Sequence, residues 1–217
     1  MKLLRLTLLG ALALLFASTA LAGTKGTNLF AIQVANGTAD LYSQNDDHFI
    51  SAFDHSEIGL QAQMWHFLSP DYAMTVSAGF GYFGETDSPG NNAPASEQDF
   101  KYTQSSWNVR VGGDRVVSVG DRALVYFGPG VQYWTGKSKF DYGTGAGSIY
   151  NWESTNVTRF SLSGRIGAIM NLSRSVGLGC QLGREVGLAS ATDMGRKASW
   201  WPSSFDAAGG IVFGLGK

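Results

Sequence analysis

The chain is poor in cysteine and proline, and after its first residues it contains no long unbroken apolar run. Its one cysteine, Cys180, excludes an intramolecular disulfide, so the fold is not a disulfide-stapled secreted scaffold. A membrane-spanning helix needs about 18 consecutive apolar residues, and no segment beyond residue 22 supplies them. The 16 Lys and Arg residues are balanced by 17 Asp and Glu residues, so no basic surface indicates a nucleic-acid partner.

The first 22 residues have the composition of a secretory signal peptide. Lys2 and Arg5 form a basic start, residues 8–16 are apolar, and a small-residue cleavage site ends at Ala22. We expect cleavage after Ala22, export from the cytoplasm and one mature domain over residues 23–217.

Large apolar residues alternate with small or polar ones through most of the remaining chain. In the segment 159–185, Phe160, Leu162 and Ile166 fall on one face, while the other face is mostly Gly and Ser with a few charged residues. A period of two indicates β-strands. Eight segments show it, over 27–36, 56–67, 73–84, 105–116, 123–134, 157–170, 176–188 and 204–215. Each is about as long as the 9–11 residues with which a tilted strand crosses a bilayer.

The connections between these segments alternate strictly between short and long. Three are tight turns, at 68–72, 117–122 and 171–175. Four are long, at 37–55, 85–104, 135–156 and 189–203. This pattern puts every tight turn at one end of the sheet and every long loop at the other, as in outer-membrane barrels. Loops of such length are uncommon in a compact soluble domain.

The polar face of the predicted strands is the better candidate for the interior. Its glycines and serines suit a crowded space, and its larger members are Gln33, Gln61, Gln63, Thr75, Ser77, Asn108, Arg110, Gln132, Arg165, Gln181 and Asp206. The large apolar residues would then face lipid, with aromatic residues near the strand ends, where interfacial girdles lie.

A secreted, lipocalin-like barrel is the main alternative, since it is also antiparallel and up-and-down. It would place large apolar side chains inside and charged ones outside. In this chain only His66, Arg115 and Arg184 put an ionisable group on the apolar face, and all three lie towards strand ends. The pattern therefore favours a barrel in a membrane.

With this layout the chain resembles the small eight-stranded outer-membrane β-barrels of Gram-negative-type bacteria, similar to the OmpA and OmpX barrels. The resemblance covers residues 23–217 and rests on strand number, loop asymmetry, face parity and the signal peptide. It implies an all-β, eight-stranded, antiparallel up-and-down transmembrane barrel in the cell outer membrane. It also implies contact with outer-membrane lipid, lipopolysaccharide and the outer-membrane assembly machinery. Such proteins typically end on an aromatic residue used in assembly, whereas this sequence ends on Lys217.

The lumen of an eight-stranded barrel is just wide enough to be filled by side chains. Counted up from the tight turns, four ionisable residues lie near the loop end and two lie lower. The upper four are Glu57, Arg159, Glu185 and Asp206, and the lower two are Arg110 and Arg165. Because isolated buried charges are costly, we predict a structural network of ion pairs rather than a gate or a ligand site.

The opening hairpin gives this network a register. If residues 170 and 176 flank the turn, Arg165 lies opposite Gln181, and Arg159 lies diagonal to Glu185, within an arginine's reach. We predict an ion pair between Arg159 and Glu185, with Glu57 or Asp206 sharing the guanidinium.

Two other chemistries are weaker candidates. His55, Ser56 and Glu57 suggest a hydrolase, but adjacent strand residues point to opposite faces, and the chain has no G-x-S-x-G elbow. The acidic segment 43–49 could supply oxygen ligands to a Ca²⁺ ion, but a solvated acidic loop is the simpler interpretation. We therefore expect no catalytic residues, no metal and no cofactor.

These observations predict a monomeric, non-enzymatic outer-membrane barrel with a filled lumen. It would present four long loops outside the cell for envelope structure, surface contact or adhesion, with a surface partner that the sequence does not name. Two alternatives stay open: a narrow or gated conduit for small polar solutes, and a lipid-modifying outer-membrane enzyme.

Overall fold

The computed structural model describes most of the chain beyond residue 25. The described ranges are 26–39, 56–87, 100–120, 122–141, 152–153, 157–173, 175–193, 196–201 and 203–215. The expected signal peptide lies outside them, so its cleavage stays a prediction. Within these ranges, no helix is long and apolar enough to cross a membrane.

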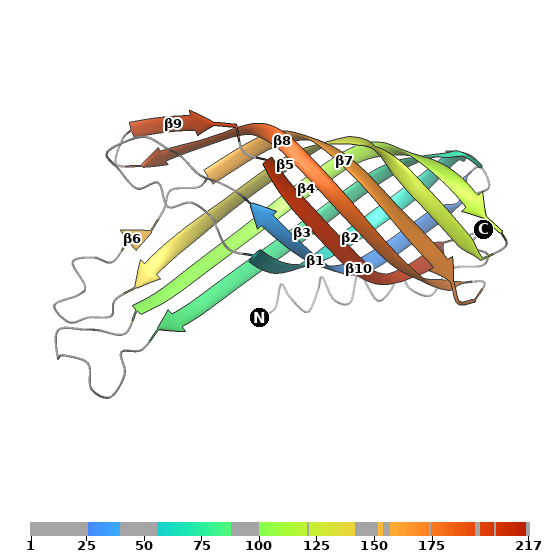
Figure 1. Ribbon diagram of the computed structural model, residues 1–217, viewed down its shortest axis with the longest axis horizontal. Coiled ribbons are helices and arrows are strands. Elements are labelled where there is room, and N and C mark those ends of the chain that lie inside the picture. The colour runs from blue at the N-terminus through green and yellow to red at the C-terminus, as the bar shows by residue number, and fades with distance from the viewer. Residues whose placement is uncertain are drawn as a thin grey trace.

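Eight long strands form the wall of a barrel. They are β1 (Asn28–Ala39), β2 (Ser56–Ser69), β3 (Tyr72–Asp87), β4 (Phe100–Val119), β5 (Ala123–Asp141), β7 (Val157–Asn171), β8 (Val176–Asp193) and β10 (Ser203–Leu215). Each pairs antiparallel with the next long strand. The last strand, β10, also pairs with β1, which closes the sheet (Figure 1). The predicted fold, an eight-stranded up-and-down β-barrel, is confirmed.

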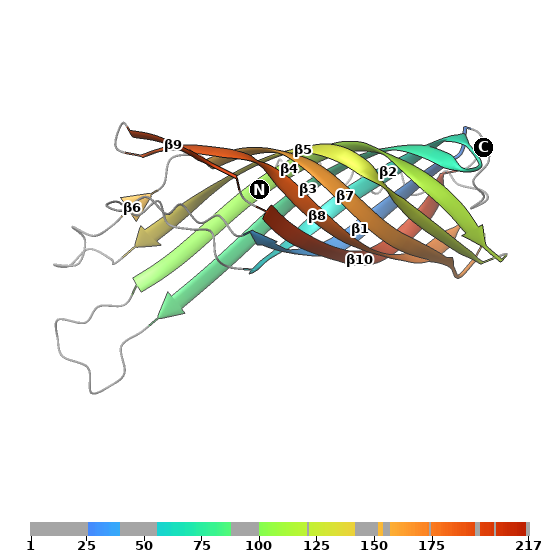
Figure 2. The same ribbon diagram turned by 45° about the horizontal axis from the view of Figure 1, so that its top comes forward.

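Several strands continue past their predicted ends on the loop side. β3 reaches Asp87, β4 begins at Phe100, β5 reaches Asp141 and β8 reaches Asp193. Two short strands, β6 (Trp152–Glu153) and β9 (Arg196–Trp200), pair with the loop-side ends of β5 and β8. Figures 1 and 2 show these extensions projecting beyond the ends of β1 and β10. Alternation of apolar and polar residues does not predict these extensions, because it detects only strand segments that have one apolar and one polar face.

The three tight turns lie where the sequence predicts them, at the other end of the barrel. Gly120, between β4 and β5, has a φ of 62°, a left-handed conformation that glycine adopts without steric cost. The predicted register of the β7–β8 hairpin is wrong by two residues, because Arg165 lies opposite Gly183 rather than Gln181. The backbone oxygen of Val176, the first residue of β8, accepts hydrogen bonds from the backbone nitrogens of Leu172 and Ser173, which closes the turn at this residue.

The two faces of the wall are assigned correctly by the sequence. Leu60 and Leu162 point outward and are 63% and 69% exposed, whereas Gln63 and Ser161 point inward and are each 1% exposed. A wall with exposed apolar side chains and a polar interior matches a membrane barrel and is opposite to a lipocalin-like one.

Candidate functional site

The turn side of the lumen is filled by an apolar layer, here called the floor. It consists of buried side chains from seven strands: Leu29, Ala31, Trp65, Phe67, Ala73, Val116, Leu124, Tyr126, Ile169 and Val212. The rings of Trp65 and Tyr126 meet edge to face, with centroids 5.4 Å apart. Burying a large apolar side chain contributes about 1.5–3 kcal/mol, so the floor stabilises the barrel and closes its turn side. The alternation of the sequence does not predict the floor, although Trp65 and Phe67 fall on the lumen parity next to a tight turn.

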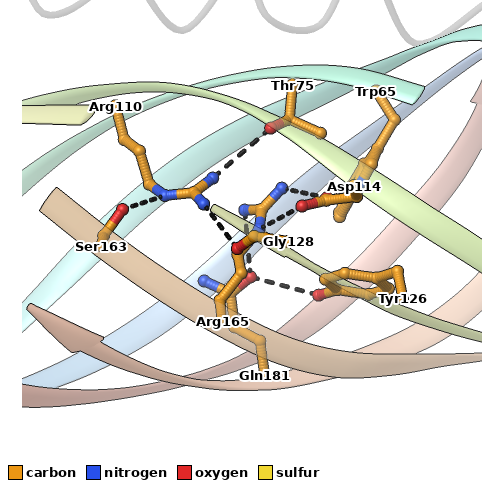
Figure 3. A network of polar contacts seen from close by, with 9 residues as sticks. All are labelled: Trp65, Thr75, Arg110, Asp114, Tyr126, Gly128, Ser163, Arg165 and Gln181. Carbon is orange, nitrogen blue, oxygen red and sulfur yellow. Dashed lines mark hydrogen bonds and ion pairs between the residues drawn. The ribbon is translucent and has the colours of Figure 1, made fainter. Parts of the chain in front are cut away.

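Next to the floor, a buried carboxylate and a buried guanidinium pair in the centre of the lumen (Figure 3). Asp114 is 1% exposed. Its Oδ1 accepts a hydrogen bond from Arg165 Nε at 3.2 Å, and its Oδ2 accepts one from Arg165 Nη2. Trp65 Nε1 donates to the same Oδ2 at 3.1 Å. This two-point geometry, with a further donor on the carboxylate, offsets part of the desolvation of both charges.

Arg165 is also held by neutral and aromatic groups. Its Nη1 donates to Gln181 Oε1 at 3.4 Å, and that oxygen accepts a second hydrogen bond from the Tyr126 hydroxyl at 3.1 Å. The guanidinium carbon lies 5.4 Å from the Tyr126 ring centroid and 5.8 Å from that of Trp65, distances at which a cation is attracted to an aromatic ring. Asp114 is absent from the predicted site, yet it lies in the predicted strand 105–116 with the lumen parity of Arg110, and that signal could have found it.

Arg110 reaches across the lumen to uncharged oxygen atoms. Its Nε donates to Ser163 Oγ at 2.8 Å, and its other nitrogens lie 3.4 Å from Thr75 Oγ1 and the Gly128 carbonyl oxygen (Figure 3). A Cβ at residue 130 would come within 2.6 Å of this guanidinium. Gly130 therefore provides the room that the arginine occupies, which gives one lumen-facing glycine a structural reason.

Arg159 and Glu185 meet on the loop side of the lumen. Arg159 Nη2 donates to Glu185 Oε2 at 2.6 Å, and both side chains are buried. Ser161 donates to the same oxygen, and Arg159 Nη1 donates to Ser204 Oγ at 3.1 Å. Although Arg159 lies opposite Ala189 and Glu185 lies opposite Ser163, the two side chains span this offset along the wall.

The remaining predicted site residues are placed differently. Asp206 lies opposite Gly183, and among the described residues it forms no ion pair, with Arg159 or with any other cation. Arg159 therefore shares its guanidinium with Ser204 instead of Asp206. Glu57 lies in β2 opposite Gly37, but its side chain falls outside the described part of the structure.

A cavity of about 100 Å³ lies on the loop side, above Arg110 and Arg165. Its lining includes Arg159, Glu185 and Asp206. The lumen thus has a packed turn side and a polar, more open loop side.

Some of the residues on which the hydrolase and metal hypotheses depend lie outside the described part of the structure. His55 and the acidic segment 43–49 lie outside the described ranges. Within those ranges, no group of three or more His, Cys, Asp or Glu residues is positioned to hold a metal ion.

Comparisons with known proteins agree with the geometry. No family model matches the chain, and no curated protein is significantly similar to it in sequence. Among solved structures, the outer membrane protein OprG from Pseudomonas aeruginosa is similar, with a TM-score of 0.56 at 11% identity over 90% of this chain and 99% of that one. A major outer membrane protein from Thermus thermophilus is similar with a TM-score of 0.51 at 12% identity, over 86% of this chain and 99% of that one.

These likenesses define the class of fold. The chain has the fold of the small outer-membrane β-barrels, and the resemblance inferred from its sequence is confirmed at that level.

Proposed function

We propose that this protein is a non-enzymatic barrel of the bacterial outer membrane that presents its loop side outside the cell for envelope structure, surface contact or adhesion. The observation that carries the proposal is the closed turn side of the lumen. Leu29 and Phe67 pack there with the other floor residues, and Trp65 links the floor to the Asp114–Arg165 pair. A polar solute would have to displace these side chains to pass. This argument favours a filled scaffold over a conduit.

The loop side supports a role in surface contact. β3, β4 and β5 remain paired beyond the ends of β1 and β10, out to Lys101 and Asp141. On another part of the rim, β9 pairs with β8 between Ala189 and Asp193. Backbone hydrogen bonds hold these extensions, so they form a rigid base, and rigid elements position binding segments more precisely than loops do.

Recordings in planar bilayers test the filled lumen. The wild-type barrel should give no steady unitary current, whereas the double variant Trp65→Ala with Phe67→Ala should conduct because it removes two rings from the floor. Leu60→Ala with Met64→Ala is the matched control, since it truncates two outward-facing residues of the same strand. A steady wild-type current as large as that of the floor variant would favour the conduit.

The membrane location has its own test. The folded protein should migrate faster unboiled than boiled on a detergent gel, because a closed barrel leaves no sheet edge to open. Identical mobility together with solubility in plain buffer would contradict the proposal. A screen of lipid A products from cells that express the protein addresses the lipid-modifying alternative, for which any new product would be positive evidence.

A further inference from the structure

The outer face of the barrel is hollowed over β10 and the neighbouring strands β8 and β7. Ala207 and Gly209 form a low surface there, which Cys180 of β8 continues. Larger side chains border it, Leu182 on β8 and Val34 on β1. The hollow has a volume of about 620 Å³ and is lined almost entirely by apolar atoms. We call it the β10 groove.

The loop-side end of the β10 groove carries a positive charge. A second hollow of about 570 Å³ shares Leu182 and Ala207 with the first and adds Arg184 and Phe205. The guanidinium carbon of Arg184 lies 5.1 Å from the Phe205 ring centroid. Asn36, which borders both hollows, adds a polar amide. An apolar groove with a cation at one end has the chemical character of a lipid with an apolar chain and an anionic headgroup.

Arg184 differs from the other ionisable residues that the sequence placed on the outer face. His66 and Arg115 lie close to the tight turns, whereas Arg184 lies eight residues beyond the first residue of β8, towards the loop side. A charge on a lipid-facing wall is destabilising unless it reaches the interface or an anion. The cation–π contact with Phe205 orients the guanidinium at the groove, and no carboxylate in the described part of the chain forms an ion pair with Arg184.

A second copy of the chain fits this surface less well than a lipid. Two barrels in one membrane pack about an axis along the membrane normal, so residues of equal depth face each other. Packing through the β10 groove would bring Arg184 of each copy to the same level, where like charges repel.

We propose that the β10 groove binds one acyl chain of lipid A, the phosphorylated lipid anchor of lipopolysaccharide, and that Arg184 and Asn36 bind its phosphate. The proposal rests on the proposed outer-membrane location, because the loop side then faces the outer leaflet. It gives the barrel a defined lipid partner at a defined strand instead of a uniform coat of lipid.

Native mass spectrometry of the folded barrel, released from neutral detergent, measures the bound lipid. The probes are diphosphoryl lipid A and a phosphatidylcholine as the zwitterionic comparison. The wild-type protein should retain one lipid A molecule in preference to phosphatidylcholine. Arg184→Gln should weaken lipid A binding about tenfold and leave phosphatidylcholine binding unchanged, because only the charge contact is lost.

Matched variants separate the groove from the rest of the wall. Ala207→Leu should weaken the binding of both lipids, whereas Ala78→Leu, at an exposed outward position of β3, should change neither. Arg115→Gln, which removes an outward-facing cation on the turn side, should also change neither. Equal losses from Arg184→Gln and Arg115→Gln, or equal wild-type binding of the two lipids, would overturn the proposal. Gel mobility of each variant before boiling verifies folding, and its failure for the wild type would instead overturn the proposed membrane location.

Discussion

Asp114 and Glu185 are both buried carboxylates of the lumen, and each pairs with an arginine, yet their surroundings differ. Asp114 accepts three hydrogen bonds, two from Arg165 and one from Trp65, and lies against the floor. Glu185 accepts both of its hydrogen bonds on one oxygen and borders a cavity of about 100 Å³. Arg159 Nε, in the second pair, has no hydrogen-bond partner among the described residues.

The comparison suggests a division of labour along the barrel axis. The turn-side pair is buried against the rings of Trp65 and Tyr126, so losing one partner leaves a poorly solvated charge. The loop-side pair lies beside polar space, so water can replace part of a lost contact. Stability should therefore depend on the turn side, and the loop side should tolerate change.

The largest expected effect is that of Asp114→Asn. The amide keeps the shape of the side chain but leaves the Arg165 guanidinium buried without a counter-charge, which should cost about 3–5 kcal/mol. Urea titration of folding into lipid vesicles measures it. As a control, Asp114→Leu with Arg165→Met removes both charges and should recover most of the loss. A cost below about 1 kcal/mol for the single variant would show that the turn side is as wet as the loop side.

The second prediction concerns the floor itself. Leu29→Ala should cost about 3 kcal/mol, because it removes a fully buried side chain and leaves a cavity. Leu60→Ala is the matched control on the neighbouring strand, since its side chain points outward, where lipid chains can fill the space. The same urea titration compares the two variants. Similar costs would mean that the floor is loosely packed and that the turn side is not closed.

The third prediction tests the loop-side pair by a double-mutant cycle of Arg159→Met and Glu185→Leu. The 2.6 Å hydrogen bond between buried groups should give a coupling free energy of about 2 kcal/mol. That value is smaller than the loss at Asp114 because the cavity allows water to approach. Strictly additive costs, measured by folding into vesicles, would show that the two residues do not interact in the membrane.

The fold could be predicted from the sequence because one rule applies to every strand of such a barrel. Outward residues such as Leu60 must be apolar, inward ones such as Ser161 must be small or polar, and eight segments obey this together. The register of the β7–β8 hairpin could not be predicted in the same way. A shift of two residues keeps every side chain on its face, so alternation cannot detect it, and the hydrogen bonds of Val176 decide it instead.

The lumen was predictable only in part. The pair of Arg159 and Glu185 could be predicted, because a charged side chain that points into the lumen needs a partner of opposite charge. Asp114 lies on the same parity as Arg110, so the same pattern predicts that it faces the lumen. The floor is not predicted by a rule that places every large apolar residue against lipid. Trp65 and Tyr126 indicate the rule that would predict the floor. A large aromatic side chain at an inward position near a tight turn closes the lumen instead of facing lipid.

The smallest effect is expected for Asp206→Asn, which makes the same chemical change as Asp114→Asn at a different depth. Asp206 is only partly buried, lines the loop-side cavity, and forms no ion pair with any described residue. Removing its charge leaves each nearby arginine with another carboxylate, because Arg110 is attracted more strongly by Asp114 than by Asp206 and Arg159 keeps Glu185. The cost should therefore stay within about 1 kcal/mol, the range of a solvent-screened charge. The two substitutions make the same chemical change, but only Asp114 holds an ion-pair partner, so the difference between their costs in one urea titration measures what the enclosed ion pair of the turn side contributes. If Asp206→Asn were as costly as Asp114→Asn, Asp206 would have to hold a desolvated partner in the membrane, and the two sides of the lumen would be alike.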